Sequence, residues 1–162
     1  MLFGAVHEKR KNSTIRVRKA KSIVMLGNTI ECYFDPKIDL DKQIHFQVLK
    51  ETRHYGIYFK PAGAMTEGTK YGDGASLLRH VSKARQTSYP VNRLDLETPG
   101  IVVVAFDSKT QNKLQEIWRK EVTKGYQAIV LGELSGKGSF KEKINKKPSE
   151  TIYNCVEQVS GE

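Results

Sequence analysis

Apolar and polar residues alternate over residues 14–34, the pattern of short strands that bury one face. The apolar positions fall in three runs, at residues 15–17, 23–25 and 30–34. Turn residues at Gly27-Asn28 and Asp35-Pro36 mark the ends of the second and third runs. We therefore predict three short strands in this part of the chain.

A linker over residues 38–50 leads into another predicted strand, where apolar residues alternate from Ile44 to Val48. Residues 54–60 continue as a strand, and a glycine-rich loop over residues 68–74 precedes a predicted helix over residues 75–83. The loop lacks the GxxxxGK[ST] pattern of a phosphate cradle. We assign its glycines to turns and to a flexible rim.

The strongest pattern lies over residues 101–106, where the sequence IVVVAF is typical of a central strand buried on both faces. A helix is predicted next, and Ser108 with Gln111 fits a capping box at its start. Its apolar face is formed by Leu114, Ile117, Trp118 and Val122.

Strands dominate the remainder. Residues 124–134 alternate as one strand, Gly136 and Gly138 mark a hairpin-like turn, and two strands are predicted near residues 140–144 and 151–159. The whole pattern predicts a mixed α+β fold rich in strands.

Length and composition fit a globular protein of one domain, with 162 residues, 38% hydrophobic and 28% charged. Its apolar runs fall short of the roughly 20 residues that cross a bilayer, and the N-terminus does not resemble a secretory signal. We predict a cytoplasmic protein that does not contact membranes. Organellar targeting is the alternative, because the N-terminal stretch is basic and poor in acids.

The two cysteines form no CxxC pair, and the four histidines show no HxxxH or HExxH spacing. We therefore predict reduced thiols and no metal site.

The net charge is +9, which favours contact with nucleic acid over a merely solvated basic surface. The basic residues form two clusters. The first consists of Lys9, Arg10, Lys11, Arg16, Arg18, Lys19 and Lys21, and the second of Lys137, Lys141, Lys143, Lys146 and Lys147.

One acid stands out, Asp95, which follows Asn92-Arg93-Leu94 and precedes Thr98-Pro99-Gly100 at the start of the central strand. A neighbouring guanidinium such as that of Arg93 keeps a carboxylate ionised and nucleophilic. From the residues alone, the signal is weak, because an arginine and an aspartate in a turn more often form a surface ion pair or brace a loop.

Residues 92–105 resemble the central motif of the RluA and RsuA branches of the pseudouridine synthases, which carry HRLD or GRLD, then TSG or TEG and an apolar strand. Residues 122–132 (VTKGYQAIVLG) are similar to the family's V-x-K-x-Y-x-A-x-V-x-G segment, and residues 58–63 (YFKPAG) resemble its strand ending in K-P-x-G. The three segments occur in the family's order.

The resemblance implies a uridine isomerase of structured RNA, either ribosomal or transfer RNA, that needs no cofactor. Asp95 aligns with the catalytic aspartate, Tyr126 with the active-site tyrosine that stacks on the target base, and Arg93 with an arginine that holds the flipped-out nucleotide. Lys60 aligns with the lysine of the K-P-x-G motif, whose role is more structural than chemical. We count Lys60 and Lys124, with the first basic cluster, among the expected RNA contacts.

The implied fold is a mixed, mostly antiparallel sheet of the pseudouridine synthase type with flanking helices. Residues 1–36 are then a basic N-terminal extension, the remnant of an RNA-binding domain, and residues 37–162 a partial catalytic domain. Asn92, Leu96 and Pro99 depart from the family pattern, and its later L-x-T-G-R-x-H-Q motif has no counterpart here. The alternatives are a piece of a longer enzyme, an inactive RNA-binding or assembly module, and a site completed by a partner chain.

Overall fold

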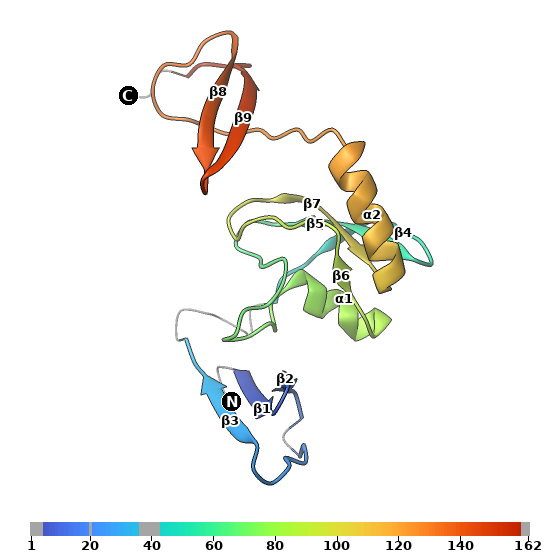
Figure 1. The fold of residues 1–162 in the computed structure, drawn as a ribbon. Helices are drawn as coiled ribbons and strands as arrows, with labels where there is room; N and C mark the ends of the chain where they lie inside the picture. Colours follow the sequence, from blue (N-terminus) through green and yellow to red (C-terminus); the bar gives the residue numbers. More distant parts are fainter. Residues whose placement is uncertain (1–4, 20, 36–42, 160–162) are drawn as a thin grey trace. The chain divides into compact units, whose positions relative to one another are not determined.

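A computed structural model describes residues 5–19, 21–35 and 43–159, in two compact units that divide at Thr123 and Lys124 (Figure 1). The domain boundary predicted at residues 36 and 37 lies outside the described residues. It stays a prediction.

The first unit begins with a three-stranded antiparallel sheet in the order β2-β1-β3. Its strands are β1 (Ala5–Arg10), β2 (Ser13–Val17) and β3 (Thr29–Tyr33). The sequence predicted β2 and β3 and missed β1.

The strand predicted at residues 23–25 is wrong, because this segment turns back onto Glu8. The buried Glu8 carboxylate accepts hydrogen bonds from the Met25 amide and from the Asn28 side chain, at 3.4 and 2.6 Å. Both groups are held in a turn rather than in a ladder.

The second sheet carries the main core and has the antiparallel order β4-β5-β7-β6. Its strands are β4 (Gln47–Glu51), β5 (Tyr55–Lys60), β6 (Tyr89–Pro90) and β7 (Gly100–Ala105). Helix α1 (Leu77–Arg85) lies between β5 and β6 in the chain, and helix α2 (Ser108–Lys120) follows β7. Two helices with antiparallel sheets make this an α+β fold (Figure 1).

The central strand is β7, as predicted. Val102 and Val104 pack in one cluster with Leu77 and Val81 of α1. Val103 and Ala105 belong to a second cluster, which includes Leu114 and Trp118 of α2. Side chains alternate across a strand, so both faces of β7 are covered and the continuous apolar run is explained.

The capping box predicted at Ser108 is wrong. Asp107 is the N-cap of α2, and its carboxylate accepts a hydrogen bond of 2.7 Å from the Thr110 amide. On the predicted apolar face, Leu114 and Trp118 pack toward the sheet and Ile117 is exposed. Val122 is exposed as well, because α2 ends at Lys120, before this residue.

The second unit contains the hairpin of β8 (Lys137–Ile144) and β9 (Lys147–Asn154). Its turn lies at Asn145 and Lys146, both with positive φ as a type I′ turn requires, so the turn predicted at Gly136 and Gly138 is wrong.

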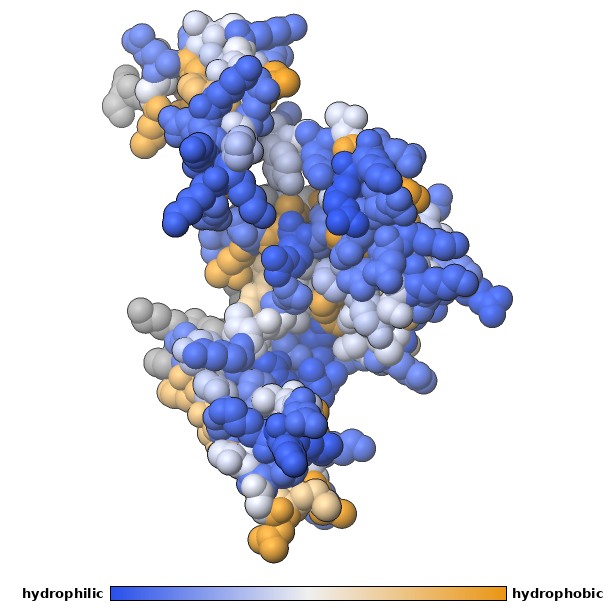
Figure 2. Space-filling model, viewed as in Figure 1, coloured by the Kyte–Doolittle hydropathy of each residue, from blue (hydrophilic) through white to orange (hydrophobic). Residues whose placement is uncertain are grey.

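The strand predicted over residues 124–134 is also wrong. The segment is extended, but no strand pairs with it within the described part of the chain. Several of its apolar side chains are exposed, and Figure 2 shows apolar patches on the surface of this unit.

Glu51 connects β4 to β5 and to α1 through hydrogen bonds of its side chain. Its carboxylate accepts hydrogen bonds from the Tyr58 hydroxyl at 2.7 Å and from the Arg85 guanidinium, near the end of α1, at 2.5 Å. Arg85 first, and Tyr58 second, lower the pKa of Glu51.

Replacing Glu51 with glutamine is expected to lower the free energy of unfolding at neutral pH by about 1 kcal/mol, because the pair is partly exposed and solvent screens it. The folded pKa lies below the usual value, so the contribution is present above about pH 4.5 and is lost as the pH falls through the folded pKa. Urea unfolding near pH 7 and near pH 3 measures this. Glu116→Gln, which removes only an exposed pair with Lys120, is the control. A Glu51→Gln deficit that persists unchanged in acid would contradict the assignment.

Candidate active site around Asp95

The segment between β6 and β7 carries Asp95 on an exposed turn. The Thr98 amide donates to the Asp95 carbonyl at 3.1 Å, which closes the turn and leaves the carboxylate in solvent. The predicted nucleophile is therefore accessible.

The residues before Asp95 are fixed by two side chains. The Thr66 hydroxyl accepts from the Leu94 amide at 3.1 Å and donates to the Leu94 carbonyl at 2.8 Å. The Asn92 amide accepts from the Val103 amide at 2.9 Å and donates to the Ile101 carbonyl at 3.0 Å. The Asn92 side chain thus continues the pairing of β6 along β7.

The residues after Asp95 are fixed by Lys60 and Gly63. The Lys60 ammonium and the Gly63 amide both donate to the Leu96 carbonyl, at 3.0 and 2.9 Å. Lys60 also donates to the carbonyls of Pro61 and Ala64, at 3.2 and 2.7 Å. One ammonium therefore ties the end of β5, the following loop and the Asp95 turn together.

Lys60 is fully buried, and burial lowers its pKa although the charges of Glu97 and Asp95 act in the opposite direction. An ammonium whose three hydrogens point at backbone carbonyls is not presented to a phosphate. This geometry favours support of the site as the role of Lys60, in place of the predicted RNA contact.

Asp95 borders an open depression of about 500 Å³, a size within the usual range of about 300–1,000 Å³ for sites that hold a small molecule. Its wall includes Thr66, Glu67, Arg93 and Leu94. The hydrogen bonds to the backbone of Leu94 and Leu96 fix the main chain on both sides of Asp95 and so hold this residue at the depression.

Arg93 shares the depression, but its guanidinium is paired with Glu67 at 2.5 Å and not with Asp95. The hydrogen bond to Glu67 is the main cause of the raised pKa of Arg93. The sequence missed Glu67 and Thr66, because they come to Asp95 from a loop about 28 residues earlier and no spacing rule connects them.

Tyr126 lies in the second unit, 70% exposed, on the extended segment that was predicted as a strand. Lys124 is exposed on the same segment. The active-site role that the resemblance implies for Tyr126 stays a prediction.

The first basic cluster is partly paired within the chain. Lys9 pairs with Glu31 at 2.7 Å and Arg10 with Glu8 at 2.8 Å. Arg16 and Arg18 both pair with Asp73. Lys11, Lys19 and Lys21 are exposed.

Within the described ranges, no three residues among His, Cys, Asp and Glu are grouped to hold a metal ion. No helix of residues 5–19, 21–35 and 43–159 is long and apolar enough to cross a membrane.

The chain is similar to several bacterial enzymes. It is 25% identical over 153 residues to the ribosomal large subunit pseudouridine synthase D of Yersinia pestis. The aligned region covers 87% of this chain and 46% of that protein. The enzyme of the same name from Escherichia coli K12 is 34% identical over 67 residues, 41% of this chain and 21% of that protein. An RNA pseudouridine synthase of Helicobacter pylori J99 is 29% identical over 126 residues, which make up 76% of this chain and 40% of that protein.

The chain thus spans between about a fifth and about half the length of these relatives. The RNA pseudouridylate synthase family matches residues 54–162, a range that takes in Lys60, the Asp95 depression and the second unit. This chain belongs to the RNA pseudouridylate synthase family.

Proposed function

We propose that this protein isomerises uridine to pseudouridine in structured RNA, with Asp95 as the nucleophile. The observation that carries the proposal is an exposed carboxylate whose flanking residues, Leu94 and Leu96, are both fixed by hydrogen bonds at the edge of a depression. A positioned carboxylate is what a covalent or proton-abstracting step at the ribose requires.

The reaction breaks the C1′–N1 bond of uridine and forms a C1′–C5 bond. A proton leaves C5 and one is gained at N1, so the product is an isomer and the reaction consumes no cofactor. Asp95 acts by attack on C1′ or by promoting glycal formation. The base must leave the stack first, at a cost of a few kcal/mol.

Tyr126 and Arg93 complete the proposal. The Tyr126 ring stacks on the extruded base, an interaction worth roughly 1–3 kcal/mol, and its hydroxyl is a candidate for removing the ribose 2′ proton. Arg93, at the rim of the depression, holds the nucleotide through its phosphate or sugar. The sheet β4-β5-β7-β6 is proposed as part of the family's central sheet.

Ribosomal RNA of the large subunit is the proposed substrate class, because two of the relatives are named for it. The domain division at residue 36, a partner chain at the site and a cytoplasmic location are proposed with it.

Pseudouridine mapping tests the proposal directly. Large-subunit RNA from cells with and without the protein, and transcripts treated with the purified chain, are derivatised with carbodiimide, because pseudouridine and uridine have the same mass. We expect one or a few positions to lose pseudouridine without the protein and to gain it in vitro. Salt-sensitive RNA binding with no modified position would instead favour an RNA-binding module.

A further inference from the structure

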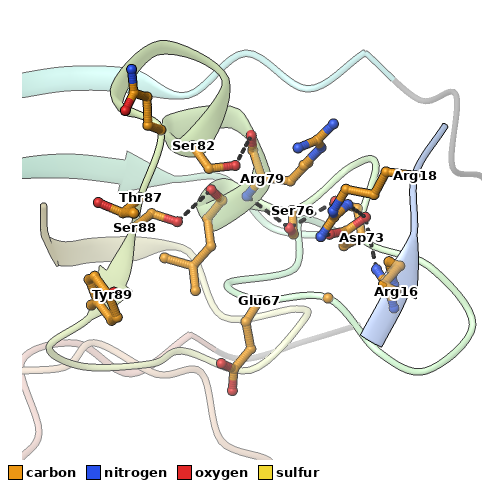
Figure 3. Close-up of a pocket in the computed structure, with 13 residues that line it drawn as sticks. Arg16, Arg18, Glu67, Asp73, Ser76, Arg79, Ser82, Thr87, Ser88 and Tyr89 are labelled. Atoms are coloured by element: carbon orange, nitrogen blue, oxygen red, sulfur yellow. Dashed lines mark hydrogen bonds and ion pairs between the residues drawn. The ribbon is translucent and has the colours of Figure 1, made fainter. Parts of the chain in front are cut away.

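A second open depression, of about 660 Å³, lies between β2, the glycine-rich loop and α1 (Figure 3). Gly68 lets the loop close there, since a Cβ on it would lie 2.1 Å from Cβ of Asp73. The depression is lined by three arginines, Arg16, Arg18 and Arg79. Two acids, Glu67 and Asp73, also line it, so the arginines exceed the carboxylates by one and the depression favours an anion.

Two of the arginines are already oriented. Arg18 grips both oxygens of Asp73, at 3.1 and 2.7 Å, and Arg16 reaches the same carboxylate at 2.8 Å. Burial raises the pKa of Asp73, but Arg18 and Arg16 outweigh it, so the net shift is downward and the carboxylate stays charged. The Arg18 side chain remains 43% exposed and keeps surface for a second anion.

Arg79 is different, because its guanidinium has neither a hydrogen bond nor an ion pair with any residue that the structure describes. It is half-buried on the face of α1 that lines the depression. The nearby hydroxyls of Ser76, Ser82 and Ser88 donate to backbone carbonyls of the chain at 2.8–3.0 Å. An anion here would therefore be bound by guanidinium groups, with Arg79 as the free one.

The two depressions meet at Glu67, which lines both. In Figure 3 the Glu67 side chain points away from the cluster of Arg16, Arg18 and Asp73, and its carboxylate binds Arg93 on the Asp95 side. An RNA strand that places a nucleotide at Asp95 would carry further phosphates past this border. A chain of phosphates, rather than one small anion, therefore matches an open depression that shares Glu67 with the Asp95 depression.

We propose that the depression between β2 and α1 binds the sugar-phosphate backbone flanking the target uridine, with Arg79 and Arg18 on its phosphates. The inference rests on the proposed function for the identity of the RNA. Arginine suits this role because its planar fork binds phosphate oxygens in pairs.

The test compares Arg79→Gln with Arg119→Gln in the full chain. Arg119 lies on α2, outside both depressions, and its replacement removes the same charge. Binding of a target oligoribonucleotide is measured over a range of salt concentrations. For Arg79→Gln we expect Kd to rise about 3- to 10-fold and the salt slope to fall by about 0.7, the value of one phosphate contact on a single strand. Arg119→Gln should match the wild type.

Inorganic phosphate at constant ionic strength is the second probe, followed through the Arg79 side-chain NMR signal. A signal that responds to phosphate, with unchanged RNA affinity in Arg79→Gln, would mean a small-anion site and overturn the proposal. Equal losses in both variants, or no RNA binding by the wild type, would overturn it too. If the wild type binds RNA through Arg79 but forms no pseudouridine, the assignment of this depression to RNA phosphates stands and the proposed function fails.

Discussion

Asp95→Asn is expected to abolish pseudouridine formation while RNA affinity and thermal stability stay at wild-type levels. Asparagine keeps the size of the side chain but is not a nucleophile, and loss of such a group costs on the order of 10⁴-fold or more. The Asp95 carboxylate makes no hydrogen bond or ion pair within the described part of the chain, so its exchange should not disturb the fold. Single-turnover assays on the mapped RNA measure the loss.

Glu97→Gln is the matched control. Glu97 is an exposed acid on the same turn, two residues further on, and it does not line the depression. Its replacement should leave turnover within about twofold, since it removes a nearby charge without touching the reacting groups. Equal pseudouridine formation by Asp95→Asn and wild type would show that Asp95 is not the nucleophile.

Much of the main sheet could be predicted from the sequence. The run over residues 101–106 predicted β7 and its position in the centre, because only a strand covered on both faces tolerates continuous apolar side chains. The strand over residues 54–60 and both helices were also found. The local sequence pattern of each of these elements is sufficient to predict it.

The elements that failed depend on distant partners. Residues 124–134 have the alternation of a strand, but a strand needs a neighbour to pair with, and the described residues supply none. The segment over residues 23–25 also alternates, yet the Glu8 carboxylate, from another strand, holds it as a turn. Local pattern cannot reveal either condition.

The candidate site shows the same division. Asp95 was found because its motif is contiguous, and the structure places it on an exposed turn at a depression. The sequence assigned Arg93 as the neighbour of this acid, whereas Glu67 holds the guanidinium. Thr66 and Glu67 act across the fold, so only coordinates show them.

Lys60 is the other residue whose replacement should have a large effect, this time on stability. Lys60→Met keeps the unbranched apolar stem of the side chain, ends one atom short of the ammonium, and leaves the carbonyls of Pro61, Ala64 and Leu96 without this donor. Each loss of a partner costs about 1–3 kcal/mol, and relief of the desolvated charge offsets part of the total. We expect the free energy of unfolding to fall by about 3 kcal/mol. Urea unfolding measures it.

The pH dependence of the free energy of unfolding is a second measurement for Lys60→Met. A change in core packing alone would not alter this pH dependence. Burial puts the folded pKa of Lys60 below the usual 10.5, so between these two values the unfolded chain binds more protons. Wild-type stability relative to the variant should therefore rise with pH across that window. Lys50→Met, at an exposed position on β4, is the control and should change little. Because the Leu96 carbonyl anchors the Asp95 turn, Lys60→Met should also lower turnover; unfolding curves identical to those of Lys50→Met would show that Lys60 does not support the site.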